Sequence, residues 1–334
     1  MLKGSGDKID SIFEAFVNQN LFIDKTVLQS NYTPDTIPHR DKQIEAVASI
    51  LAPALRGERI SNLFVYGKTG SGKTLSIQYV GNRMMNKITQ LEQKHLNFLY
   101  INCKLKKVAD TEYRIIAELI HSLGGKISAT GLPTDYVYRK FIELIDNKKQ
   151  IIILVLDEVD QLIFKDQSAL YDILRINQYV GKEIGLILIS NNPHIFSKLE
   201  PRVMSSLDAE EIEFKPYNIS EMRKILEERA RYAFRNFEPA TILLAANQAV
   251  QKGGDVRIGL QCLYRAGRIA EQEDENKLKV SHIRKILSDV GNPRTEVLKN
   301  KMGDNEKLIV NLVNKSGDIP FGELYKKYCR QSEN

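Results

Sequence analysis

Apolar residues along the chain follow two different patterns. Between residues 63 and about 207, short continuous apolar runs alternate with stretches whose apolar positions recur at helical spacing. A strand that is apolar at every position suits a parallel sheet covered by helices on both faces. The runs cover residues 63–66, 98–101, 151–156 and 186–189. This part of the chain therefore predicts an α/β fold with a parallel sheet.

From about residue 216 the pattern is helical throughout. Four periodic segments, each opening at or near an N-cap or turn residue, predict a small helical bundle. They cover residues 218–234, 238–251, 253–272 and 279–290. Glycine and proline at 291–295 mark a boundary, followed by helices predicted at 305–315 and 320–330.

The start of the chain is an arm with one amphipathic helix predicted at 9–18. Two prolines then precede a helix that Gly57 closes. The predicted organisation is an arm over 1–35, an α/β core over 36–215, an all-α domain over 216–292 and a short C-terminal piece over 293–334.

Composition narrows the class of protein. The 334 residues are 43% hydrophobic and 27% charged, which is ordinary for a globular protein with two or three domains. No apolar run is long enough for a bilayer, and the first residues lack a signal core, so we expect a cytoplasmic protein without a membrane partner. The net charge of +6 permits nucleic-acid binding without establishing it. The three cysteines show no metal spacing.

A glycine-rich turn follows the first predicted strand. Residues 67–74 read GKTGSGKT and fit G-x-x-x-x-G-K-[ST] at every fixed position, between a strand and a helix. Such a loop surrounds phosphates with backbone N–H groups, while its lysine reaches the β and γ phosphates and its hydroxyl ligates Mg²⁺. The predicted nucleotide-binding residues are Gly67, Lys68, Thr69, Gly70, Ser71, Gly72, Lys73 and Thr74.

Two carboxylates complete the predicted site. Asp157 and Glu158 follow the strand at 151–156, and ligands of open α/β sheets lie at such carboxyl ends. Asp157 can hold Mg²⁺ together with Thr74, and Glu158 can polarise the water that attacks the γ-phosphate. Asn191, after the next apolar run, is placed to orient that water or the γ-phosphate.

Two arginines are candidates to neutralise charge on the γ-phosphate. Arg202 lies in LEPRVMSSL, and Arg257 follows the glycine pair that opens a helix of the all-α domain. An arginine alone is more often a solvated surface group.

The order of these motifs resembles the AAA+ ATPases. Longer stretches, among them IPHRDKQ to APALRGER, LVLDEVDQL and GGDVRIGLQCLYRAGRIAE, resemble archaeal replication initiators related to origin-recognition and cell-division-control proteins. The resemblance covers roughly residues 22–334. It implies a P-loop AAA+ core, an all-α lid and a C-terminal winged helix.

The resemblance also implies roles for single residues. Asn191 matches the first sensor of the family and Arg257 the second. Nucleotide contacts match Tyr217 and Arg229, and the adenine pocket matches Pro38, His39 and Arg40. A DNA-touching insertion of the core resembles SATGLPTDYVYRKF, so that Thr130, Gly131 and Leu132 are candidate minor-groove contacts, with a bland surface loop as the alternative.

Three departures from the family pattern limit what carries over. Asn192 stands where relatives commonly have an acid, and Met204 where many have a basic residue, which leaves open whether Arg202 acts in cis or in trans. Residues 305–334 match only the opening helices of a winged helix. We expect either a truncated sequence or a short member of the family.

The implied function is an ATP-regulated initiator that binds duplex origin DNA and helps recruit the replicative helicase, beside other copies of itself. ATP and ADP with Mg²⁺ are the implied ligands, and weak ATP hydrolysis acts as a switch. The implied location is the cytoplasm, at the nucleoid. Two alternatives remain: a clamp-loader-like ATPase with fast turnover, and a signalling NTPase that binds protein partners.

Overall fold

The structure is a computed structural model that describes most of the chain. The described residues are 21–30, 32–92, 96–104, 112–128, 131–146, 151–165, 167–179, 184–289, 303, 309, 312 and 321–332. They fall into two compact units. We call residues 24–233 with 245–261 the sheet unit, and 21–23, 234–244 and the rest from 262 onward the helical unit. The boundary between them passes within α10 (Pro239–Gln251) and α11 (Val256–Gln272).

The sheet unit is built on a five-stranded parallel sheet in the order β2-β3-β4-β1-β5. All four predicted apolar runs are strands, and β3 and β4 are buried at every position. Because β1 lies between β4 and β5, the loop after β1 meets the carboxyl end of β4. The strands are β1 (Asn62–Tyr66), β2 (Leu96–Asn102), β3 (Ile151–Asp157), β4 (Ile184–Ser190) and β5 (Ala209–Glu213).

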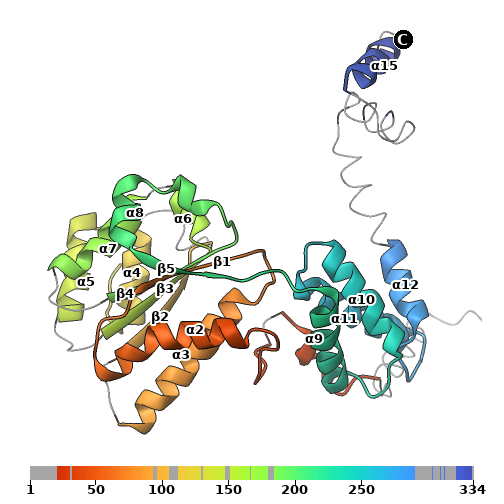
Figure 1. The fold of residues 1–334 in the computed structure, drawn as a ribbon, viewed down its shortest axis with the longest axis horizontal. Helices are drawn as coiled ribbons and strands as arrows, with labels where there is room; N and C mark the ends of the chain where they lie inside the picture. The colour runs from red at the N-terminus through yellow and green to blue at the C-terminus, as the bar shows by residue number, and fades with distance from the viewer. Residues whose placement is uncertain are drawn as a thin grey trace, which may run out of the picture. The chain divides into compact units, whose positions relative to one another are not determined.

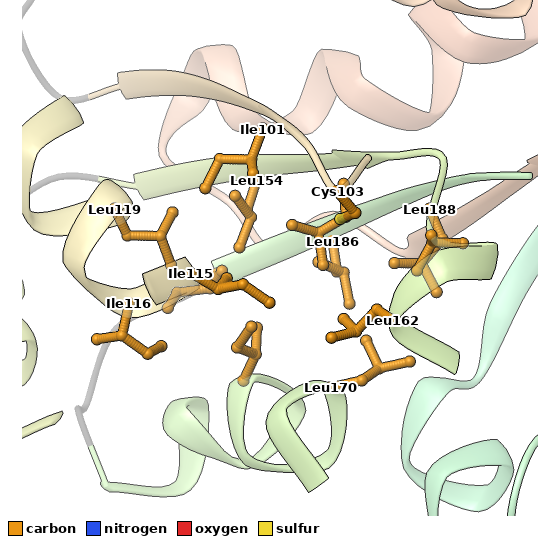
Figure 2. Packing of buried hydrophobic residues seen from close by; sticks show 14 of the residues in the cluster. Ile101, Cys103, Ile115, Ile116, Leu119, Leu154, Leu162, Leu170, Leu186 and Leu188 are labelled. Atoms are coloured by element: carbon orange, nitrogen blue, oxygen red, sulfur yellow. The ribbon is translucent and has the colours of Figure 1, made fainter. Parts of the chain in front are cut away.

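Alternate residues of the strands enter two separate cores. Ile152, Leu154 and Leu156 of β3 pack into one cluster with the helices between residues 112 and 207, while Ile153 and Val155 pack into the other with the helices between residues 41 and 90. Figure 2 shows the first cluster, in which strand residues such as Leu154 and Leu186 point toward helical residues such as Ile115 and Leu162. The sheet is therefore covered on both faces, as the continuous apolar runs predicted.

Helices flank the sheet along the whole unit (Figure 1). The glycine that closes α2 was predicted correctly, but Pro53 turns the last five residues into a 3-10 helix that ends at Gly57, with φ 80°. The elements are η1 (Thr26–Leu28), α2 (Asp41–Leu51), η2 (Ala52–Arg56), α3 (Lys73–Gln90), α4 (Glu112–Ser122), α5 (Thr134–Asp146), α6 (Asp160–Lys165), α7 (Ser168–Tyr179), η3 (Ile195–Lys198) and α8 (Pro201–Leu207).

The helices predicted from residue 216 onward are confirmed. Each matches one periodic segment, and the last predicted helix of the chain also forms. The elements are α9 (Ile219–Ala233), α10 (Pro239–Gln251), α11 (Val256–Gln272), α12 (Val280–Asp289) and α15 (Phe321–Ser332). The helix at 9–18, the boundary at 291–295 and most of 305–315 lie outside the described residues, so the winged-helix piece and the four-domain division stay predictions.

Within the helical unit, aromatic packing joins the start of the described chain to the end of α9. The rings of Phe22 and Phe234 have centroids 4.7 Å apart, and their backbones form an antiparallel bridge. Gly267 of α11 leaves room for them, since a Cβ there would lie 2.3 Å from Phe22. No helix in the described ranges combines the length and the apolar content needed to cross a bilayer.

Candidate functional site

A pocket of about 380 Å³ opens in the sheet unit. Its volume is in the range of small-molecule sites. Four parts of the chain contribute: the segment before α2, the P-loop, the carboxyl ends of β2 to β4, and helices α9 and α11. The lining residues include Gln29, Tyr32, Thr33, Pro34, Ile37, Pro38, Thr69, Gly70, Gly72, Lys73, Thr74, Tyr100, Asn102, Asp157, Glu158, Asn191, Tyr217, Ile225, Arg229, Val256, Arg257 and Leu260.

The P-loop follows β1, and its glycines are required by the local geometry. Gly67 has φ 150°, and a Cβ there would lie 2.2 Å from the carbonyl oxygen of Phe214, which follows β5. Gly72 has φ 91° and would place a Cβ 2.9 Å from the Tyr217 hydroxyl. Larger residues at these two positions would force the loop away from its neighbours. The loop then opens α3 at Lys73, so the helix N-terminus faces the pocket.

Lys73 reaches back over the loop. Its Nζ donates to the carbonyl oxygens of Gly67 at 2.8 Å and Lys68 at 2.9 Å, and to Oδ1 of Asn191 at 3.0 Å. The side chain is almost fully buried, and this burial lowers the pKa of Lys73 to about 8, although Asp157 opposes the shift. Within the residues that the structure describes, no carboxylate lies in hydrogen-bond contact with this buried ammonium, so it is suited to meet an anion.

Asp157 ends β3 and gathers donors from two other elements. Its Oδ2 accepts from the Thr74 hydroxyl at 2.7 Å and from the Tyr100 hydroxyl at 2.6 Å, and its Oδ1 accepts from the Glu158 N–H. Burial and the bond to Asp157 raise the pKa of Tyr100. Sequence reasoning predicted Asp157 and Thr74 together, but missed Tyr100.

These hard oxygen donors fit Mg²⁺. The Thr74 hydroxyl and the Asp157 carboxylate are hydrogen-bonded to each other beside the phosphate-binding loop. Mg²⁺ commonly takes only one or two ligands from the protein and its remaining ligands from phosphates and water. In the described part of the chain no group of three or more His, Cys, Asp or Glu residues forms a cage of its own. The donor set is therefore of the kind that binds a metal jointly with a nucleotide.

Glu158 and Asn191 lie beside this carboxylate. Glu158 has φ 55°, a conformation that non-glycine residues rarely adopt, and its side chain lies 3.4 Å from Nζ of Lys104. Asp160, which sequence reasoning missed, accepts from the Ser190 hydroxyl at 2.7 Å and from the Asn191 N–H at 3.2 Å. Asp160 thus fixes the turn that carries Asn191 into the pocket.

Arg257 lines the pocket from the first turn of α11. Its guanidinium pairs with Asp255, with Nη2 to Oδ2 at 2.8 Å and Nε to Oδ1 at 3.0 Å. The hydrogen bond to Asp255 raises the pKa of Arg257. The structure therefore brings Arg257 to the P-loop, and adds Asp255, which was not foreseen.

The segment before α2 forms a further part of the pocket lining. Arg229 of α9 lies with its guanidinium carbon 4.4 Å from the centroid of the Tyr32 ring and donates to the Val27 carbonyl at 3.4 Å. Burial lowers the pKa of Arg229. Tyr32 falls in the predicted arm over 1–35, for which no role in the site was predicted. Lining residues of this segment run from Gln29 to Pro38.

Arg40 was predicted to line an adenine pocket with Pro38 and His39, but its side chain braces the P-loop instead. Its Nε donates to the Ser71 carbonyl at 2.8 Å and its Nη2 to the Lys215 carbonyl at 2.6 Å. Its guanidinium carbon lies 3.8 Å from the centroid of the Tyr217 ring. Of the three residues only Pro38 is part of the pocket lining.

The remaining predicted residues lie elsewhere. Arg202 of α8 is not among the lining residues; it pairs with Glu200 at 2.6 Å and lies over the Tyr171 ring. Leu132, before α5, packs partly buried against the first core cluster, while Gly131 is exposed with φ 93°. Thr130 lies outside the described residues. The roles of these residues stay predictions.

Comparisons with known proteins agree on one family. Residues 58–199 match the AAA domain, and residues 223–286 match the Cdc6 AAA+ ATPase-type lid domain. The ORC1-type DNA replication protein of Thermococcus kodakarensis is 38% identical over 336 residues, covering 96% of this chain and 80% of that protein. The ORC1-type DNA replication protein 1 of Methanosarcina mazei is 36% identical over 331 residues, covering 96% of this chain and 79% of that protein.

A solved structure has the same fold. The Aeropyrum pernix ORC1 protein in complex with DNA superposes with a TM-score of 0.75 at 33% identity, covering 93% of this chain and 81% of that chain. The matched stretch takes in both the P-loop sheet and the helices after it. The AAA+ resemblance of the sequence is thereby confirmed at the level of fold.

Proposed function

Because this chain belongs to the ORC1-type DNA replication proteins, we propose that it is an ATP-regulated initiator that binds duplex DNA at origins. In this proposal the nucleotide in the pocket of the sheet unit sets the affinity for DNA. Slow hydrolysis converts the ATP-bound state to the ADP-bound state. The DNA-bound protein then helps to recruit the replicative helicase.

One observation carries the proposal. The side chains to which the proposal gives phosphate-binding, metal-binding and water-orienting roles all line the same pocket: Lys73, Asp157 with Thr74, Glu158 and Asn191. They come from separate parts of the chain. Arg257 also lines this pocket, and it belongs to α11, which lies within the region that matches the lid domain. A surface acidic turn or an ordinary βα turn would not need this convergence.

Each residue has a specific task in the proposal. The N–H groups of Gly70 to Thr74 and the Lys73 ammonium hold the phosphates, and Arg257 contacts the terminal one. Thr74 and Asp157 would hold Mg²⁺, which neutralises charge between the β and γ phosphates. Glu158 accepts the proton of the attacking water, which Asn191 orients. Arg229 and Tyr217 contact the nucleoside, beside the segment from Gln29 to Pro38.

The proposed DNA contacts lie outside this pocket. In this proposal Thr130, Gly131 and Leu132 contact the minor groove, and residues 293–334 would supply the start of a winged helix. Of the three, Gly131 is exposed just before α5. The net charge of +6 favours association with phosphate backbones. The aligned Aeropyrum pernix protein was solved in complex with DNA. Other copies of the chain are the proposed partners for Arg202, which lies apart from its own pocket.

A genomic pull-down tests this function. The purified chain, with ADP or with the non-hydrolysable triphosphate AMP-PNP, is mixed with sheared DNA of its source, and the retained fragments are sequenced. Enrichment at one or a few intergenic loci is the expected result. Uniform recovery that disappears at modest salt would indicate non-specific binding and contradict the proposal. Retention of no DNA, with binding of a protein partner instead, would favour a signalling NTPase.

A further inference from the structure

Asp255 joins the start of α11 to the P-loop. A Cβ built on Gly70 would lie 2.0 Å from Oδ1 of Asp255, so this carboxylate packs directly against the glycine backbone. Gly70 has φ 74°. Only glycine combines that conformation with so close a neighbour. Asp255 is not itself a lining residue of the pocket, so it contacts the loop from beside the phosphate-binding space.

The turn before Asp255 holds it in place from the other side. Gly254 has φ 81°, its N–H donates to the carbonyl of Ala249, and a Cβ there would lie 2.9 Å from Pro216. Oδ1 of Asp255 also accepts from the N–H of Arg257 at 2.9 Å, which is the bond of a helix N-cap. The carboxylate is therefore fixed by backbone contacts on both sides, and its side chain is only 15% exposed.

Asp255 occupies one edge of the Arg257 guanidinium. Both Nε and Nη2 donate to the two carboxylate oxygens, at 3.0 Å and 2.8 Å. Within the described residues, no side chain or carbonyl accepts a hydrogen bond from Nη1. The arginine side chain remains 50% exposed and lines the pocket. A forked ion pair of this kind fixes the plane of the guanidinium and leaves its other edge available.

We infer that Asp255 is a positioning residue that aims Arg257 at the terminal phosphate and thereby sets the preference of the pocket for a nucleoside triphosphate over a diphosphate. The inference rests on the proposed nucleotide function. Without Asp255, the Arg257 side chain would lose rotamer freedom on contact with the γ-phosphate, and this loss would weaken binding. The pair with Asp255 already restricts the side chain before the nucleotide arrives. A diphosphate does not need this contact, so its affinity is independent of Asp255.

Nucleotide binding to the full chain tests the inference. Affinities for AMP-PNP and ADP are measured by calorimetry with Mg²⁺, after removal of any co-purified nucleotide. Asp255→Asn and Asp255→Ser both keep a capping oxygen but lose the forked ion pair. We expect each to weaken AMP-PNP binding about two- to fivefold, as for a half-exposed ion pair, with ADP binding unchanged. Asp135→Asn, which removes a carboxylate in the first turn of α5, is the matched control and should change neither affinity.

A double-mutant cycle separates positioning from a structural role. Arg257→Gln should lose the triphosphate preference by itself, and Asp255→Asn should then add nothing. Equal weakening of both nucleotides, tighter AMP-PNP binding in Asp255→Asn, or an undiminished effect beside Arg257→Gln would overturn the inference. If the unmodified chain binds neither nucleotide, the proposed function itself fails, and this outcome is distinct from the other three.

Discussion

Two groups of residues line the pocket, and the chain builds them differently. The motif group, residues 67–74 with Asp157, Glu158 and Asn191, lies at the ends of buried parallel strands. The segment group, Gln29 to Pro38 with Arg229, comes from an irregular stretch before α2 and from the middle of α9. The first group is positioned by a sheet whose register fixes every strand end. The second is positioned by side-chain contacts such as Arg229 over Tyr32.

This difference suggests a division of labour. Phosphate chemistry needs fixed distances between charged atoms, which strand ends in a buried sheet provide. Recognition of a nucleoside needs a complementary surface, which an irregular segment can supply. If this is right, changes in the motif group should remove binding or hydrolysis, and changes in the segment group should alter which base is preferred.

The largest effect is expected from Glu158→Gln. The amide cannot accept a proton, so hydrolysis should fall by about 10² to 10⁴-fold while ATP binding is retained. Phosphate release under single-turnover conditions measures the hydrolysis rate, and calorimetry measures ATP binding. Glu211→Gln, on the exposed face of β5, is the control. Turnover at the unmodified rate would remove Glu158 from the mechanism.

Lys73→Ala should weaken the binding of both ATP and ADP by about a hundredfold or more. The buried ammonium donates to the loop carbonyls of Gly67 and Lys68, and alanine leaves the phosphates without this cation. Lys87→Ala, an exposed lysine in the last turn of the same helix, is the matched control. Unchanged ADP retention by Lys73→Ala would contradict the assignment of the P-loop.

Tyr32→Ala tests the segment group. Loss of an aromatic face should weaken adenine nucleotides by about tenfold and reduce the preference for ATP over GTP. Tyr32→Phe keeps the ring over Arg229 and should behave as the unmodified chain. Competition with a fluorescent nucleotide measures both the loss of ATP affinity and the ratio of the ATP and GTP affinities. An equal loss for ATP and GTP would show that the segment group does not discriminate bases.

The smallest expected effect is the uptake of a proton by Lys73 when a nucleotide binds at alkaline pH. Because burial lowers the pKa of Lys73 to about 8, the free protein loses this charge as the pH rises through that value. Phosphates favour the protonated form and raise the pKa again, so binding above pH 8 should take up a proton and grow weaker with pH. Calorimetry at pH 8.5 in buffers of different ionisation enthalpy counts the protons. No uptake at that pH would place the pKa of Lys73 outside this window.

The same contrast explains what the sequence could predict. The P-loop, Asp157 with Thr74, Asn191 and Arg257 were predictable, because each follows a short local pattern at a strand end or helix start. Tyr100 and Asp160 were not, since each acts on a partner that only the fold brings near, and the contact of Asp255 with Gly70 depends on the fold in the same way. The contacts of Arg40 with the carbonyls of Ser71 and Lys215 were not predictable for the same reason, because these partners are distant in the chain.

The fold shows the same limit. Four of the five strands were predicted from their continuous apolar runs. β5 was missed because its sequence, AEEIE, places acidic residues on an exposed edge and resembles a polar loop. The helices after residue 216 were predicted because amphipathic periodicity is local. The segment from Gln29 to Pro38 has no periodicity, so only the family resemblance placed a part of it, Pro38, at the pocket.

The central claim is that the nucleotide in this pocket controls DNA binding. The most direct measurement is the affinity for a DNA duplex from the enriched locus. It is made with AMP-PNP and with ADP, for the unmodified full chain and for Lys73→Ala, at two salt concentrations. We predict that the affinities with AMP-PNP and ADP differ, that the difference vanishes in Lys73→Ala, and that all fall with salt. Equal affinity with both nucleotides, or a difference that persists in Lys73→Ala, would contradict the account.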